Sequence, residues 1–522
     1  MEQTLSLSFL APVALLGVAA LSSQRSGRRP GQLPVWSENA ALAALALSAG
    51  GVLQFILAGP AQLAVFEGAA FLALRAGPVS VTLALLVAFI GWVVMRYSRT
   101  YLDGEEGEGR FHGLMLATLA AVLIFVQSGS LAALILSAAL VGVGLRHLIL
   151  FYPERSEARR AAAKFALVWH GGDVMLVCSA LLLFAAFATA DIDVINSMAA
   201  SAGLTPVAQA ALVFLVAAAV LKTAAFPLHG WLTEVMEAPT PVSALLHAGI
   251  INSGGVLLIM TAGLVQSSPG AMAALVMIGG FTALFGAAVM LTQSAVKTAL
   301  AWSTVSQMGF MLLQCGLGLW ALALLHIVAH SLYKAHAFLS SGGAVAAVAG
   351  LRRPGPVAVP NLNAVMKAFG LAIVLYGVIA VLFTALFGPK TAQALALGAI
   401  LIFGVAYLVA QGLADTAPRA LTKRTALASL AAAIAYFSFQ AVAEAVWGPA
   451  LPTPPAPGAL EWALVILAVA SFGLVAFAQA LFPLWAHHPS TAGLRVHLAN
   501  GFYLNALLDR AIGGFRITKP NN

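Results

Sequence analysis

Nine ionisable side chains stand inside strongly apolar sequence between residues 221 and 341. They lie in two stretches, LKTAAFPLHGWLTEVMEAPTPVSALLHAGIINSGG and LLHIVAHSLYKAHAFLSSG, and are Lys222, His229, Glu234, Glu237, His247, His326, His330, Lys334 and His336. A lysine or an acid at the centre of a hydrocarbon layer costs at least ~2.5 to 3.5 kcal/mol, so such residues mark a functional site by default. Acids, lysines and histidines in this setting are typical of proton or ion transfer.

Three of these residues share one face of a single predicted helix. His326, His330 and Lys334 are spaced by four residues, which stacks them along ~12 Å of a helix. Histidine changes its charge near neutral pH, so this stripe can pass protons along through intervening water. The alternative is that the three groups only satisfy one another or backbone carbonyls at a helix junction. Three groups in register favour the relay.

A helix break is predicted between Lys222 and His229. Pro227 lacks a backbone N–H and clashes with the preceding turn, so a regular helix cannot continue through it. Broken helices in transporters expose backbone groups and half-helix dipoles at mid-membrane, where ions and charged side chains settle. Lys222 lies at this break, and His247, about two turns into the next apolar segment, follows as a second relay station. The alternative is a proline kink whose lysine reaches to the membrane surface.

Three acids are supporting candidates. Asp173, in KFALVWHGGDVMLV, lies deep enough to need a partner, which Lys164 or His170 on the same helix could supply. Glu234 and Glu237 are expected at the cytoplasmic mouth of a pathway, either as proton collectors or as ordinary solvated residues.

The composition is that of a polytopic membrane protein. Of 522 residues, 61% are hydrophobic and 8% are charged, far below the ~25% charged residues of soluble domains. The two cysteines, Cys178 and Cys315, lie in apolar runs and imply no disulfide framework. The net charge of +8 resides mainly in short loops, where membrane orientation explains it better than nucleic-acid binding does.

Fifteen apolar runs are long enough to cross a ~30 Å hydrocarbon core as helices. They cover approximately residues 5–21, 40–58, 78–97, 113–128, 130–152, 164–189, 207–237, 241–265, 271–292, 296–316, 318–347, 363–387, 393–414, 425–447 and 459–485. The seventh is too long for one plain helix and contains the Phe226-Pro227 interruption. The first has no basic region before it and is not interpreted as a cleavable signal. The expected fold is therefore an all-α membrane protein of about fifteen spans.

The basic residues of the loops predict the orientation. With the N-terminus outside, twenty-one of the 26 lysines and arginines fall on the cytoplasmic side, while Arg75 and Lys390 fall on the other. Basic loops collect in the cytoplasm, so the N-terminus is predicted outside and the C-terminus inside.

No extramembrane domain is predicted. The longest pieces outside the runs, residues 103–110, 452–458 and the tail after Ala486, are too short to bury a core. The chain has no G-x-G-x-x-G after a strand, P-loop, C-x-x-C or H-E-x-x-H pattern. We therefore expect no cofactor or metal in this chain, and any catalytic domain must come from a partner.

The motifs resemble those of a known family. FPLHGWLTEVMEAPTPVSALLHAG, MLTQSAVKTALAWSTVSQMGFM and LLHIVAHSLYKAHAFLSSG are similar to the antiporter-like subunits of respiratory complex I and to Mrp-type cation antiporters, from about residue 78 to 345. The resemblance implies two inverted five-helix repeats, each with a broken helix, and a mid-membrane line of lysines and histidines that moves protons. It places that role on Lys222, His247, His326, His330 and Lys334, with Lys297, which begins a span and is compatible with a surface position, as a supporting residue.

The same resemblance predicts the division of the chain. It implies three N-terminal spans (1–110), a first antiporter-like repeat (111–265), a degenerate second repeat (266–414), and C-terminal helices with a cytoplasmic tail (415–522). Two departures stand out. The fifth-helix glutamate of the complex I subunits, within GWELVG, is replaced by Ala139 in SAALVG, and the broken helix of the second repeat is not recognisable, although Pro389-Lys390 is a candidate remnant.

A narrower resemblance fits these departures. WSTVSQMGFMLLQCGLG, GWVVMRYSRTYLDG and HLANGFYLNALLDRAI are similar to DabB, the membrane subunit of the DAB inorganic-carbon accumulation complexes of bacteria. This resemblance implies a place in the bacterial inner membrane and a cytoplasmic DabA-like partner that resembles a zinc β-carbonic anhydrase and holds the zinc. It also implies that a cation gradient, most simply of protons, makes CO2 hydration to bicarbonate run one way.

Three functional hypotheses follow. The first is an ion-conducting subunit that couples a proton or sodium gradient to CO2 hydration by a partner. The second is a subunit of a redox-driven proton pump or a cation antiporter, which shares the relay but has different neighbours. The third is a membrane anchor whose buried charges are structural and which conducts nothing.

Overall fold

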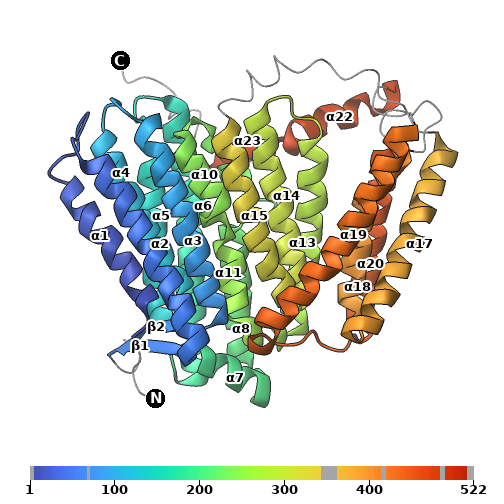
Figure 1. The fold of residues 1–522 in the computed structure, drawn as a ribbon, viewed down its shortest axis with the longest axis horizontal. Coiled ribbons are helices and arrows are strands. Elements are labelled where there is room, and N and C mark those ends of the chain that lie inside the picture. The colour runs from blue at the N-terminus through green and yellow to red at the C-terminus, as the bar shows by residue number, and fades with distance from the viewer. Residues whose placement is uncertain (1–4, 67–70, 342–360, 413–418, 482–487, 514–522) are drawn as a thin grey trace.

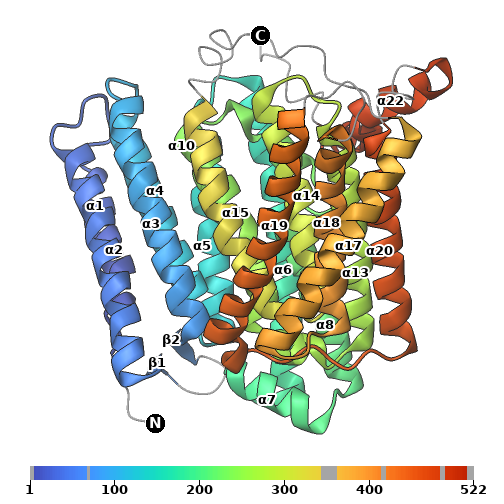
Figure 2. The ribbon, with the colours of Figure 1, turned by 45° about the vertical axis from the view of Figure 1, so that its right-hand side comes forward.

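A computed structural model describes residues 5–66, 71–341, 361–412, 419–481 and 488–513. Long helices stand side by side across the molecule, with the N-terminal helices at one end and the group α17 to α20 at the other (Figure 1). Figure 2 shows that the group α17 to α20 stands against α13 to α15.

The N-terminal part consists of η1 (Leu7–Leu10), α1 (Ala11–Ser22), α2 (Leu33–Ala58), strands β1 (Ala61–Val65) and β2 (Leu72–Ala76), and α3 (Pro78–Tyr101). The next part contains α4 (Glu108–Val126), α5 (Leu131–Ile149), α6 (Ser156–Phe187), α7 (Ile192–Ala202), α8 (Pro206–Lys222), α9 (Gly230–Thr233), η3 (Val235–Glu237), α10 (Thr240–Ala248), η4 (Ile250–Asn252), α11 (Ser253–Met260) and α12 (Ala262–Gln266).

The second half begins with α13 (Pro269–Met290), α14 (Val296–Gly316), α15 (Trp320–Ser340), α17 (Leu362–Phe387) and α18 (Ala392–Gly412). It ends with α19 (Arg419–Trp447), η6 (Gly448–Ala450), α20 (Ala459–Ala480), η7 (Pro489–Thr491), α22 (Ala492–Ala499), η8 (Gly501–Tyr503) and α23 (Leu504–Ala511). Helix occupies part of each of the fifteen predicted ranges.

Among the described residues, eleven helices are long and apolar enough to cross a membrane, and three shorter apolar helices accompany them. The protein is therefore an all-α, multi-pass membrane protein. The count of fifteen crossings stays a prediction, because several of the remaining helices are shorter or less apolar than a plain span.

The bundle has two ends, which we name by what lies there. The basic face carries the connections α1–α2, α3–α4, α5–α6 and α13–α14 together with α22 and α23, and is at the top of Figure 1. The hairpin face, at the bottom, carries β1, β2 and α7. The two strands pair antiparallel, with Ala61 opposite Ala76 and Val65 opposite Leu72. This hairpin was not predicted from the sequence, because its residues lie between two apolar runs and are themselves partly apolar.

Polar caps fix where several helices begin on the hairpin face. Ser130, Thr205 and Ser268 each accept a hydrogen bond from the backbone N–H three residues further on, at 3.2 to 3.3 Å. Pro206 and Pro269 directly follow two of these caps, where the missing N–H costs nothing and the fixed φ suits a first helical turn. The starts of α5, α8 and α13 are thereby set by local sequence.

Two spans are interrupted and one expected interruption is absent. The seventh span breaks after Lys222 and resumes as helix at Gly230, as the position of Pro227 predicts. The eighth is a series of short helices from α10 to α12, bent at Gly249 and Thr261. In the second repeat α17 runs without a break, and Pro389 and Lys390 lie in the connection between α17 and α18.

Candidate functional site

The break in the seventh span leaves Lys222 as the last residue of α8. Ala224 adopts a positive φ of 50° immediately after it, and the N–H of Phe226 donates a hydrogen bond to Thr282 Oγ1 on α13 at 3.1 Å. A backbone N–H that the interrupted helix cannot use is thus satisfied by a neighbouring helix. The break is a built feature that holds Lys222 in a defined place.

Lys222 forms an ion pair with Asp173 of α6. Its Nζ lies 2.6 Å from Asp173 Oδ1, and the lysine side chain is fully buried while that of Asp173 is 13% exposed. The same carboxylate contacts His170 Nδ1 at 3.0 Å through its other oxygen. The ammonium also lies 4.1 Å from the centre of the Trp169 ring, a cation–π contact. A buried lysine is therefore held between a carboxylate and an indole.

Asp173 supplies the carboxylate that the fifth helix lacks. Ala139 is half-buried on α5, and the space between α5 and the lysine is filled by Trp169, whose Nε1 donates to the carbonyl of Ala138 at 3.2 Å. A Cβ built on Gly142 would lie 2.4 Å from Trp169 Cδ1, so this close approach of α5 to the indole requires glycine. The carboxylate beside Lys222 is thus supplied by α6.

A second buried lysine, Lys164, has different partners from those predicted. Of the two partners expected for Asp173, His170 makes the contact and Lys164 does not. Lys164 lies inside α6 and its side chain is fully buried. Nine residues of helix separate it from Asp173, about 13 Å along the axis. Its Nζ lies 2.6 Å from Glu234 Oε1, 2.6 Å from Asp509 Oδ1 and 2.7 Å from Asn505 Oδ1.

The C-terminal helix α23 brings Asn505 and Asp509 to this cluster. Asn505 also donates to Glu234 Oε1, and a Cβ built on Gly230 would lie 2.3 Å from Asn505 Oδ1, so α23 seats directly on α9. We name Lys164, Glu234, Asn505 and Asp509 the inner-mouth cluster, because α23 lies at the basic face (Figure 1). The cluster closes this face over the helix break.

His247, His330 and Lys334 come together between α10, α14 and α15. His247 Nδ1 contacts Thr304 Oγ1 at 3.1 Å, and its ring stacks on Phe338 at 4.2 Å between centroids. His330 Nε2 donates to the backbone carbonyl of His247 at 3.2 Å. We name His247, His330 and Lys334 the central cluster.

Lys334 is fully buried and donates to the backbone carbonyl of Leu300 at 2.9 Å. Within the described parts of the chain no acidic side chain lies within ion-pair distance of it. Lys222 and Lys334 are thus opposite cases, one buried lysine with a carboxylate and one without. A buried ammonium without an acidic partner is costly, because its charge is left without compensation.

His326 borders open space together with His330. Its Nδ1 contacts Gln314 Oε1 at 2.8 Å, and its ring centre lies 5.9 Å from that of His330. Both histidines line a cavity of about 460 Å³ between α14 and α15 on one side and α18 and α19 on the other. Gln307 and Tyr333 also line it, so it has the polar groups that water needs.

Three of the remaining candidates lie nearer the surface, and the fourth, His229, is buried. Glu237, 42% exposed, pairs with Arg155 at 3.4 Å, and Lys297 contacts Thr240 Oγ1 at 3.5 Å. His336 is exposed on α15. His229 is buried beside the rings of Trp302, Phe285 and Phe226. No hydrogen bond or ion pair among the described residues joins the Lys222–Asp173 pair to the central cluster, so a transfer between them requires water or side-chain movement.

Comparisons with known proteins fit this geometry. Residues 128–414, more than half of the chain, match the family model described as NADH:quinone oxidoreductase/Mrp antiporter, TM. Residues 69–112 match the N-terminal model of complex I chain 5. A probable inorganic carbon transporter subunit DabB2 of Halothiobacillus neapolitanus is 34% identical over 98% of this chain and 94% of that protein.

The chain belongs to the DabB family of antiporter-like membrane subunits.

Other relatives of this DabB-family chain lie further away or match over a shorter stretch. A probable DabB of Hydrogenovibrio crunogenus is 44% identical over 50% of this chain and 51% of that protein. The NADH-quinone oxidoreductase subunit L of Mycobacterium tuberculosis is 31% identical over 76% of this chain and 62% of that protein. The resemblance predicted from the motifs is confirmed.

Two solved structures share the fold. The Mrp complex from Dietzia sp. DQ12-45-1b contains a chain with a TM-score of 0.64 and 23% identity, over 99% of this chain and 60% of that one. The archaeal membrane-bound sulfane sulfur reductase contains one with a TM-score of 0.57 and 15% identity, over 97% of this chain and 99% of that one. The DabB-family chain thus has the antiporter-like fold of an ion-translocating membrane subunit.

Sequence reasoning missed the inner-mouth cluster as a unit. The signal was present in HLANGFYLNALLDRAI, where Asn505 and Asp509 are four residues apart on a short amphipathic helix, but nothing in the sequence indicated that Lys164 receives them. In the described part of this DabB-family chain, no three His, Cys, Asp or Glu side chains converge as a metal site would need.

Proposed function

We propose that this DabB-family subunit conducts a cation, a proton in the first instance, through the membrane, and that a cytoplasmic zinc partner of the DabA type uses this flow to hydrate CO2 to bicarbonate in one direction. The observation that carries the proposal is the Lys222–Asp173 pair at the broken helix. A fully buried lysine is costly in a membrane even when it lies 2.6 Å from a carboxylate. Such a residue is therefore interpreted as part of a functional site.

The proposed path has three stations formed by chain segments far apart in sequence. The inner-mouth cluster takes protons from the basic face, the Lys222–Asp173 pair holds one at the break, and the central cluster passes it on with His326. Lys334 has no acidic partner in the described structure and donates to the backbone carbonyl of Leu300. We place the basic face in the cytoplasm, with the N-terminus outside, following the distribution of positive charge, and we place the zinc in the partner.

The driving force suffices for accumulation. One elementary charge crossing 100 mV releases about 2.3 kcal/mol, which sustains a concentration ratio of about 50. One proton per bicarbonate is therefore enough for a useful gradient.

The proposal is tested by bicarbonate accumulation in cells that carry this chain with its partner. We expect a proton uncoupler to abolish accumulation and sodium removal to leave it unchanged. Loss on sodium removal alone would assign the flow to sodium. Accumulation that survives the uncoupler and sodium removal together would support the non-conducting anchor instead.

The inner-mouth cluster gives a graded prediction. Replacing Asp509 by asparagine leaves Lys164 paired with Glu234, so we expect the chain to fold and proton flux to fall about tenfold, since one of two collecting carboxylates is lost. Arg510→Ala changes the next residue, which is exposed on the same helix, and is the matched control. Equal proton flux in Asp509→Asn and Arg510→Ala would show that α23 does not take part in the pathway.

A further inference from the structure

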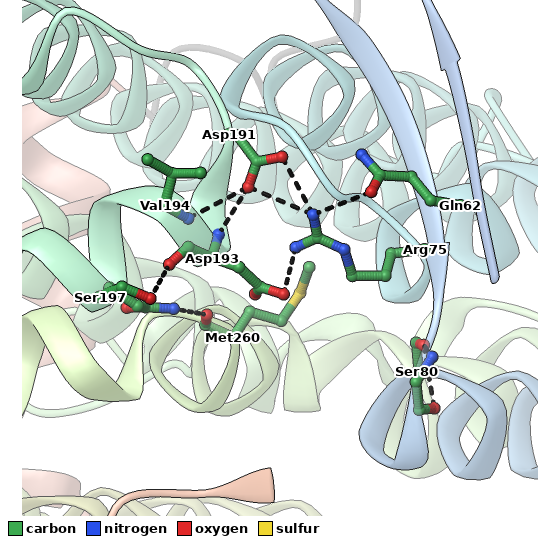
Figure 3. A network of polar contacts seen from close by, with 10 residues as sticks. Gln62, Arg75, Ser80, Asp191, Asp193, Val194, Ser197 and Met260 are labelled. Atoms are coloured by element: carbon green, nitrogen blue, oxygen red, sulfur yellow. Dashed lines mark hydrogen bonds and ion pairs between the residues drawn. The ribbon is translucent and has the colours of Figure 1, made fainter. Parts of the chain in front are cut away.

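A cavity opens on the hairpin face next to the Arg75 network. It has a volume of about 610 Å³, and Arg75, Ser80, Ser128 and Asp193 are among the residues that line it. Figure 3 shows Arg75 between Asp191 and Asp193, with distances of 3.0 Å and 2.5 Å from its guanidinium to the two carboxylates. We name this cavity the outer vestibule; Arg75 and Asp193 are the charged residues among those that line it.

A second, much smaller cavity lies deeper in the bundle. Its volume is about 20 Å³, and Asn252, Ser253 and Ser331 are the polar residues that line it. That volume suits one water molecule. Val126 lines both cavities, and Val256 of the inner one lies three residues before Ile259 of the outer one on α11. The two cavities therefore follow one another along the same helices.

Asn252 has an unused acceptor at this inner cavity. Its side chain is 3% exposed, and its Nδ2 donates to the carbonyl of Ala248 at 3.1 Å and to Ser331 Oγ at 3.0 Å. Its Oδ1 is buried and has no hydrogen-bond partner in the described structure. A buried amide oxygen left without a donor costs about 1 to 3 kcal/mol, and a water in the cavity removes that cost.

The inner cavity also adjoins the central cluster. Ser331 directly follows His330, and Ala248, which accepts from Asn252, directly follows His247. The inner cavity is thus lined by the chain neighbours of His247 and His330, while the side chains of the central cluster themselves lie outside its lining.

We infer that Asn252 and Ser331 form a single-water site, and that this water is the link through which the central cluster exchanges protons with the outer vestibule. The inference rests on the proposed function for the identity of the ion. The outer half of the proton path then runs between α3, α4, α11 and α15. It does not pass through the larger cavity beside His326.

The rate at which introduced cysteines react with silver ions tests the water site without a transport measurement. Silver ions are close to water in size and react with thiolates. In the full-length chain with Cys178 and Cys315 replaced by alanine, single cysteines are introduced as Ser80→Cys in the outer vestibule, Ser331→Cys at the inner cavity and Ser179→Cys, which is fully buried on α6. Membrane vesicles are exposed to Ag⁺ from the hairpin face, and the thiols that remain free are counted after unfolding in detergent.

We expect Ser331→Cys to react within tenfold of the rate of Ser80→Cys, and Ser179→Cys to react at least a hundredfold more slowly. A rate for Ser331→Cys as low as that of Ser179→Cys would overturn the inference. This result is independent of whether protons drive the partner, so it separates failure of the water site from failure of the proposed function.

Flux measurements complete the test. Asn252→Leu fills the inner cavity with an apolar group, and we expect proton flux, followed with a pH-sensitive dye in the same vesicles, to fall at least tenfold. Asn252→Ser replaces the amide with a smaller polar hydroxyl and leaves room for water, and is expected to retain flux within threefold. Ser98→Ala is the matched control, because that buried hydroxyl on α3 bonds the carbonyl of Val94 and lines neither cavity. Unchanged flux in Asn252→Leu would overturn the link.

Discussion

Asp173→Asn is expected to abolish proton flux, by at least a hundredfold, and to destabilise the chain. The substitution removes the carboxylate that pairs with the fully buried Lys222 in the described structure. Breaking a buried pair from one side costs about 3 to 5 kcal/mol, because the remaining charge is left without compensation. The free energy of unfolding in detergent titrations and dye-monitored flux in vesicles measure the two effects.

The matched control for this prediction is His170→Ala. That histidine contacts the same carboxylate but is 40% exposed, so we expect a change in stability below about 1 kcal/mol. The double substitution Asp173→Asn with Lys222→Met removes both charges and is expected to recover most of the stability while flux stays absent. If Asp173→Asn alone conducts normally, the Lys222–Asp173 pair has a structural role and does not hold a proton on the path.

Lys334→Met is expected to give the opposite pattern, with loss of flux in a chain that is at least as stable. Methionine keeps much of the length of the lysine side chain and removes a buried ammonium that has no carboxylate in the described structure. Removing such an unpaired charge is expected to stabilise the fold by about 1 kcal/mol. Flux is expected to fall at least a hundredfold, because the group that changes charge is gone.

His336→Ala is the control, since His336 lies two residues away on the exposed side of α15. It is expected to leave both stability and flux unchanged. A destabilised Lys334→Met chain would mean that the ammonium has an acidic partner in the working complex. Full flux in Lys334→Met would remove the central cluster from the path. Asp173→Asn is expected to lower the stability of the chain and Lys334→Met to leave it unchanged or raise it, while both abolish flux. This combination distinguishes a proton relay from a set of purely structural charges.

Much of the fold could be predicted because its determinants are local. The length of the apolar runs locates the helices, and Pro227 locates the break after Lys222, since a missing N–H acts on the turn in which it lies. The four-residue spacing of His326, His330 and Lys334 likewise places them on one face of α15. Each of these inferences needs only neighbours along the chain.

The partners of the buried charges could not be predicted in the same way. Asp173 meets Lys222 across 49 residues, and Lys164 meets Asn505 across 341. Helical periodicity says which side of a helix a residue occupies but not which helix packs there. Ala139 showed that a carboxylate was missing from α5, yet the neighbour that replaces it became clear only when α6 and α8 were seen together. The central cluster was named residue by residue, whereas its separation from Lys222 had no signature in the sequence.

The contact of α23 with Lys164 has a consequence for biosynthesis. The ribosome produces Asn505 and Asp509 only after 341 and more residues have been added beyond Lys164. In a nascent polypeptide this lysine therefore gains Glu234 first, 70 residues later, and meets Asp509 only when α23 has been made. A messenger truncated before codon 505 would yield a product with all its long hydrophobic segments and an exposed polar opening at the basic face. Cells should recognise such a product by its instability, and its turnover by membrane proteases should exceed that of the complete polypeptide.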